Sequence, residues 1–92
     1  MAVTERLVFL VKPEHQIDKF LEIENTLWTP WLRQQPGFLH KTVNVVANGQ
    51  VELLIFWKSK ADWDAAAAKK REISTLMARA KNQFPGTIFQ LN

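Results

Sequence analysis

The chain of 92 residues contains no cysteine and no tyrosine, and only two histidines. Without cysteine the chain forms no disulfide, and it has neither a thiolate nucleophile nor a cysteine-ligated metal site. The two histidines, His15 and His40, lack the i, i+4 spacing that places metal ligands on one face of a helix. The sequence therefore predicts no metal site.

Long hydrophobic runs are also missing. The two longest, residues 7–11 and 53–57, are far shorter than the roughly 20 residues that cross a bilayer. Glu5 and Arg6 stand where the apolar region of a signal peptide would begin. We therefore expect a cytoplasmic protein with no membrane partner.

The composition predicts one domain over residues 1–92, with an apolar fraction of 47%. A monomer of this size buries only about 60–65% of its unfolded surface, so self-association would add stability. The net charge of +3 raises the question of nucleic acid. However, Arg71, Arg79 and Lys81 point in three directions around a helical wheel, whereas a phosphate-binding surface needs its charges on one face. We expect no nucleic-acid partner.

Hydrophobic patterns along the chain predict the element order βαββαβ. Apolar alternation is typical of strands at residues 6–12, 38–47, 50–58 and 87–91, and helical patterns cover 14–35 and 59–84. This order predicts a ferredoxin-like α+β fold with a four-stranded antiparallel sheet and helices on one face. Pro30 predicts a kink or short break near Thr29. The basic residues 69–71 interrupt the second helical pattern and predict a joint there.

The dipeptide Asn48-Gly49 lies between two alternating runs, which strongly favours a two-residue hairpin turn. Such a turn sets a register with the cross-strand pairs Ala47–Gln50, Val46–Val51, Asn44–Leu53, Thr42–Ile55 and His40–Trp57. In that register His40, Asn44 and Trp57 share one face of the sheet.

Both faces of the predicted sheet are apolar in their middle. The face away from Leu7 and Phe9 carries Val8, Leu10, Leu54 and Phe56. An exposed apolar patch of this kind marks an interaction surface, and a second copy of the sheet would cover it. We therefore expect a homodimer through the sheet. The alternative is a solvated sheet with a few surface apolar residues.

Glu24 is the sharpest anomaly, because it falls at the centre of the apolar stripe of the first helix. A carboxylate there loses water and, unless a cation or donor compensates, becomes a base suited to neutral pH. His40 is the second catalytic candidate, and in the predicted register it could contact Glu24 with Asn44 as a donor nearby. The alternatives for Glu24 are a pairing with Lys, Arg or His across the core, or a side chain that extends past the kink at Pro30 to reach solvent. The alternative for His40 is a packed or rim residue.

The four tryptophans allow two interpretations. Trp28 and Trp57 could line a pocket for a flat aromatic ligand, together with Asn44. Large aromatic side chains more commonly fill the core, and that alternative stays open.

The order of these elements and several local motifs resemble the dimeric α+β barrel superfamily, often called antibiotic biosynthesis monooxygenase-like (ABM-like). The motifs are Pro36-Gly37-Phe38 before the second strand, and Trp57-Lys58-Ser59 followed by Asp62. The finer pattern, Trp28-Thr29 and then residues 36–39 and Lys41, resembles a little-characterised group of small cyanobacterial proteins in that superfamily.

The resemblance implies several activities. Some members oxygenate aromatic polyketides without a cofactor, some degrade haem, and many have no assigned activity. The haem-degrading branch uses an Asn on the first strand and a Trp and a His on the second helix; here the first strand has no Asn and the second helical stretch no His. The quinone-forming branch uses Asn, Trp and Tyr in a cleft. Asn44 and Trp57 could take such parts, but no Tyr is present.

Two functions follow from this resemblance and from the candidate residues. The first is a cofactor-independent monooxygenase, or a related enzyme, acting on a small aromatic compound with Glu24 and His40 as acid and base. The second is a non-catalytic ligand-binding or structural homodimer. We expect no cofactor in either case.

Overall fold

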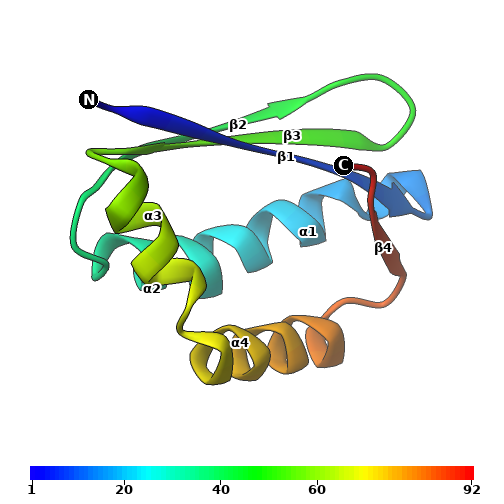
Figure 1. The fold of residues 1–92 in the computed structure, drawn as a ribbon. Helices are drawn as coiled ribbons and strands as arrows, with labels where there is room; N and C mark the ends of the chain where they lie inside the picture. The colour runs from blue at the N-terminus through cyan, green and yellow to red at the C-terminus, as the bar shows by residue number, and fades with distance from the viewer.

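A four-stranded antiparallel sheet lies on one side of the molecule and the helices on the other (Figure 1). The computed structural model describes all 92 residues. The strands are β1 (Val3–Lys12), β2 (Phe38–Val45), β3 (Gln50–Trp57) and β4 (Thr87–Gln90). Their order in the sheet is β2-β3-β1-β4, with every pairing antiparallel. The predicted ferredoxin-like α+β fold is confirmed.

The first helical stretch is divided into four pieces. These are η1 (Glu14–Gln16), α1 (Ile17–Ile23), the π-helical turn η2 (Glu24–Trp28) and α2 (Thr29–Arg33). Pro30 has no N–H to donate, and its ring displaces the carbonyl of the preceding turn. Regular α-helical bonding is therefore lost upstream of Pro30. The break spans η2 and ends just before Thr29, so it lies upstream of the predicted position, and the α-helix resumes at Thr29.

The second helical stretch also divides as predicted. The helices α3 (Lys60–Ala67) and α4 (Lys70–Gln83) are separated at Ala68 and Lys69. Ser59 is the N-cap of α3, where its hydroxyl oxygen accepts a hydrogen bond from the Asp62 backbone N–H at 3.1 Å. No helix is both long enough and apolar enough to cross a membrane.

The β2–β3 hairpin differs from the prediction by one residue. Val46 N–H donates to the Gln50 carbonyl at 2.7 Å, which leaves a three-residue loop, 47–49. Asn48 and Gly49 both have positive φ, 61° and 78°. An Asn-Gly pair accepts that conformation in loops of either length, so the sequence did not settle the loop length.

This one-residue slip moves the side chains from His40 to Val45 to the other face, while a β-bulge between Phe38 and His40 keeps Phe38 opposite Trp57. The observed pairs are Val45–Val51, Asn44–Glu52, Val43–Leu53, Thr42–Leu54, Lys41–Ile55 and His40–Phe56. Val43 and Val45 lie on the helix side in place of Thr42 and Asn44, as the hydrophobic pattern of β2 favours. The predicted pairing of His40 with Trp57 is wrong.

The core lies between the helices and the inner face of the sheet. Its two clusters comprise Val11, Phe20, Ile23, Val51, Leu53, Ala80 and Phe84, and Leu32, Ile55, Trp57 and Ala66. On the outer face, Leu10, Leu54 and Phe56 are half-buried, and Phe89 of β4 is 47% exposed. Val8 is already buried within the chain, so the outer apolar surface is smaller than expected.

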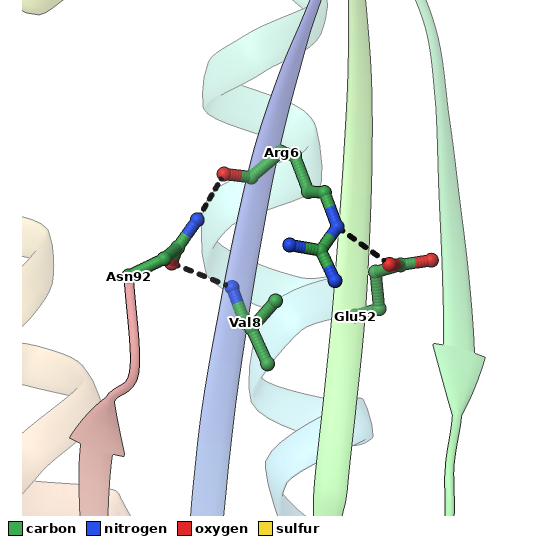
Figure 2. Close-up of polar contacts among 4 residues, drawn as sticks. All are labelled: Arg6, Val8, Glu52 and Asn92. Atoms are coloured by element: carbon green, nitrogen blue, oxygen red, sulfur yellow. Dashed lines mark hydrogen bonds and ion pairs between the residues drawn. The ribbon is translucent and has the colours of Figure 1, made fainter.

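The C-terminal residues continue alongside β1, on the side away from β3, and bond to its backbone (Figure 2). The Asn92 side-chain amide accepts from the Val8 N–H at 2.9 Å and donates to the Arg6 carbonyl at 2.7 Å. The Arg6 guanidinium also pairs with Glu52 of β3 at 2.7 Å. A charged pair therefore lies next to the apolar residues of the outer face.

Candidate functional site

A cavity of about 800 Å³ lies between the inner face of the sheet and the helices. Of the 24 residues that line it, 18 are hydrophobic, which favours an apolar occupant. All four tryptophans contribute, from η2, α2, β3 and α3: Trp28, Trp31, Trp57 and Trp63. The prediction that Trp28 and Trp57 border a pocket agrees with this placement.

Glu5 is the carboxylate that the sequence analysis did not select. It lies on β1 opposite Ile55, on the face shared with Leu7, and lines the cavity. The indole Nε1 of Trp57 donates to Glu5 Oε1 at 3.1 Å. Burial raises the pKa of Glu5 above its usual range, and the Trp57 hydrogen bond and the charge of Lys60 offset part of that rise.

Replacement of Glu5 by glutamine tests the raised pKa through stability. In the folded protein Glu5 holds its proton at pH values where the unfolded chain has lost it. Its contribution to folding is therefore present below the ordinary pKa of glutamate and lost as pH rises through the raised pKa. The glutamine side chain would not titrate and keeps an oxygen that accepts from Trp57. We expect Glu5→Gln to match the wild type near pH 4 and to exceed it in stability at pH 7.

Thermal unfolding at both pH values measures this difference. Glu22→Gln, the same change on an exposed helical position, serves as the control and should show no pH-dependent gain. A Glu5→Gln protein that is less stable than wild type at pH 7 would contradict the assignment.

Glu24 is buried, at 8% exposure, in the apolar stripe where the sequence predicted it. Its partner is Lys41: the ammonium donates to Glu24 Oε2 at 2.7 Å and to Thr29 Oγ1 at 2.8 Å. The alternative of a cation across the core is therefore the observed arrangement. Glu24 therefore borders the cavity with its carboxylate held in an ion pair with the Lys41 ammonium.

His40 and Asn44 do not enter the cavity, because the observed register turns both to the outer face of the sheet. His40 stacks on Phe56 with ring centroids 5.9 Å apart, and Asn44 is exposed opposite Glu52. The predicted contact between Glu24 and His40 is wrong. The predicted placement of Asn44 on the same face of the sheet as Trp57 is also wrong.

The tryptophans serve both as core and as lining. Trp57 is 1% exposed, packs edge-on against Phe38 and still borders the cavity. Trp28 and Trp31 are half-buried and pack edge-to-face, with their ring centroids 6.4 Å apart. Large flat side chains therefore form several walls of the cavity. No group of three or more His, Cys, Asp or Glu side chains is placed to hold a metal ion.

No protein-family model and no curated protein matches this sequence. Solved structures do. A dimeric ferredoxin-like protein from an uncultured marine organism has a TM-score of 0.74 at 17% identity, with 99% of this chain and 91% of that one covered. A Streptomyces coelicolor monooxygenase from the gene ActVA-Orf6, solved with the ligand nanaomycin D, has a TM-score of 0.71 at 19% identity, covering 98% and 82%.

A third similar structure is SnoaB, a cofactor-independent oxygenase from Streptomyces nogalater. Its TM-score is 0.64 at 14% identity, with 99% of this chain and 91% of that one covered. The chain has a ferredoxin-like α+β fold, as these structures do. At these identities the likeness concerns the fold and not the activity. The resemblance to small cyanobacterial proteins stays a prediction.

Proposed function

We propose that residues 1–92 form a single ABM-like domain that oxygenates a small, flat aromatic compound without a cofactor. The observation that carries this proposal is Glu5, an acidic side chain with a raised pKa in a largely apolar cavity. Such a carboxylate is a stronger base than an exposed one. The indole of Trp57 orients it through the 3.1 Å hydrogen bond.

In the proposed reaction a hydroxyarene and O₂ give a quinone and water. The Glu5 carboxylate takes the hydroxyl proton, and the electron-rich ring carbon of the resulting anion forms a bond to O₂. The ring is oxidised, and O₂ is reduced to a ring-bound peroxide that takes the proton held by Glu5 to become the hydroperoxide. The Glu5 carboxylate then removes the ring C–H proton as the O–O bond breaks to give the quinone, and the departing hydroxide takes that proton from Glu5 and leaves as water.

The walls supply the remaining requirements of this chemistry. Trp28 and Trp57 border the cavity and would contact the faces or edges of the ring. The apolar lining excludes water, which increases the reactivity of a delocalised anion and protects the hydroperoxide. No residue outside this chain is needed for the proton transfer.

The test uses a hydroxyanthrone as substrate and measures oxygen uptake together with quinone absorbance. We expect one O₂ consumed per quinone at a rate above that in buffer. Glu5→Gln should still bind the anthrone but lower the rate by about 10²-fold or more, the usual contribution of general acid–base catalysis. Glu22→Gln is the matched control and should keep full activity.

A second candidate is a non-catalytic ligand-binding homodimer. Two observations favour it. The Glu24 carboxylate is paired with Lys41 and so is not available as a general base, and the chain has no tyrosine to act as a proton donor. Binding of the anthrone with no rate above buffer would support this candidate and overturn the oxygenase. Failure of both binding and turnover would overturn both.

The proposal includes a homodimer formed by the outer faces of two sheets. Leu54, Phe56 and Phe89 are the apolar side chains that a second copy would cover. Arg6 and Glu52 give this face both charges, so it is suited to meet a copy of itself. A protomer mass in sedimentation equilibrium at micromolar concentration would contradict the dimer.

A further inference from the structure

The outward edge of β2 is open to solvent. β2 is the last strand on its side of the sheet, so only one of its two edges is paired. Val46 N–H donates to the Gln50 carbonyl of β3, and in an antiparallel pair alternate residues bond to the same neighbouring strand. The backbone N–H and C=O groups of Val43 and Val45 therefore point away from β3. Residues 43–48 are all exposed, so no other part of the chain covers this edge.

The opposite edge of the sheet is protected. β4 has only four residues, and where it ends the Asn92 side-chain amide bonds to the Val8 N–H and the Arg6 carbonyl of β1, as a further strand would (Figure 2). β2 has protection only in its first half, where a β-bulge follows Phe38 and Lys41 points a charge inward. The second half of β2 has neither device.

This second half is apolar and uncharged. Val43 and Val45 are 38% and 52% exposed, although their side chains lie on the helix side of the sheet. No charged residue occurs between Lys41 and Glu52. Two copies of a chain with a net charge of +3 therefore meet along this segment without bringing like charges together. An exposed apolar strand edge of this kind is a template for another strand.

We propose that two copies of the chain pair antiparallel through β2, about a two-fold axis beside Val43. This register sets Val43 opposite Val43 of the second copy and residues 41–45 opposite residues 45–41, so the pairing stays within β2. The two edges fit each other because both present the same alternation of outward N–H and C=O groups. The two four-stranded sheets then form one continuous sheet.

Thr42 gives an independent argument for this register. Its Oγ1 is the one buried side-chain oxygen or nitrogen of the chain that has no hydrogen-bond partner. Buried polar atoms seldom lack such a partner. In the proposed register Thr42 lies directly opposite Asn44 of the second copy, in the closely spaced kind of cross-strand pair. The Asn44 amide brings a donor to that side of the strand.

This surface is distinct from the cavity and from the outer face of the sheet. The backbone groups that it uses lie in the plane of the sheet, whereas side chains stand on its two faces. The inference is therefore independent of the proposed oxygenase and of the proposed outer-face dimer. Only a short segment of each chain takes part, so we expect a weak association that is populated at high protein concentration.

Single cysteine variants report the register directly, because the chain contains no cysteine. In the proposed pair the two residues at position 43 have Cα atoms about 5.5 Å apart, within the range of a disulfide. The two residues at position 45 lie four residues out of register, roughly 13 Å apart and beyond disulfide reach. Under a mild oxidant we expect Val43→Cys to form a covalent dimer about tenfold faster than Val45→Cys, the matched control.

Non-reducing electrophoresis over time measures both rates. Val45 is the more exposed of the two positions, so random collisions would cross-link Val45→Cys at least as fast. Equal rates, a faster Val45→Cys, or no cross-link in either variant would overturn the pairing.

Amide hydrogen exchange followed by NMR tests the wild-type chain. The Val43 and Val45 N–H groups should exchange about tenfold more slowly at millimolar than at micromolar concentration, as for a strand that is paired roughly nine-tenths of the time. Val45→Lys places a charge at the edge and should remove this dependence. Phe89→Lys adds the same charge at an exposed position of β4 and should keep it. Exchange that does not depend on concentration, or a dependence that survives Val45→Lys, would overturn the inference.

Discussion

Lys41→Met is expected to lower the free energy of unfolding by about 3–5 kcal/mol, the usual effect of leaving a buried charge without its partner. The side chains of Lys41 and Glu24 are 5% and 10% exposed, and their charged atoms are 2.7 Å apart. Methionine fills much of the volume of lysine, so the loss is chiefly electrostatic. Urea denaturation measures it. A domain of this size is stable by only about 5–15 kcal/mol, so the variant would lie near the unfolding threshold.

Two controls separate this effect from the loss of a lysine in general. Lys19→Met removes one member of a long, partly exposed ion pair with Glu22, at 3.5 Å, and it should change stability by about 0.5 kcal/mol or less. The double variant Lys41→Met/Glu24→Leu replaces both buried charges and should recover most of the lost stability. A single Lys41→Met variant no less stable than Lys19→Met would contradict the buried pair.

Trp57→Ala should destabilise the protein by about 3–5 kcal/mol, the range for removing a large aromatic side chain from a core. Trp57 is fully buried, joins the cluster of Leu32 and Ile55, and donates to Glu5. The substitution both leaves a void beside the cavity and removes that donor. Thermal or urea unfolding measures the loss.

Trp63→Ala is the matched control, because Trp63 lines the same cavity but is only half-buried. Its removal should have a clearly smaller effect. Trp57→Phe keeps most of the core volume and removes only the indole donor, so its stability should lie between those of wild type and Trp57→Ala. Equal losses for Trp57→Ala and Trp63→Ala would contradict the assignment of Trp57 to the core.

The fold could be predicted from the sequence because its signals are local. Ser59 with Asp62 indicates a helix start, and Pro30 disrupts the helix just before it, and both effects act within a turn of the chain. The hairpin register, in contrast, could not be predicted from residues within one turn of the chain. Asn48-Gly49 fits loops of two or three residues, and the observed register places Val43 and Val45, rather than Thr42 and Asn44, on the helix side of the sheet.

The candidate site was only partly predictable for the same reason. The burial of Glu24 follows from the helical stripe, but its partner Lys41 follows from the register. Glu5 was missed because alternation alone begins the first strand at Arg6. Val3 to Glu5 become strand by pairing with Ile55 to Trp57, far along the chain. Continuing the alternation of Leu7 and Phe9 two residues back would have placed Glu5 on the inner face.

The π-helical turn η2 fixes the rotational phase of the first helical stretch. A π turn has more residues than an α turn, so it rotates everything that follows relative to what precedes it. Glu24 at its start and Trp28 at its end both border the cavity, as do Phe20 before it and Leu32 after it. Shortening this segment by one residue would swing α2 by about 100° and carry its wall residues away from the sheet. The irregular turn is thus the spacer that keeps two helical segments aimed at the same cavity.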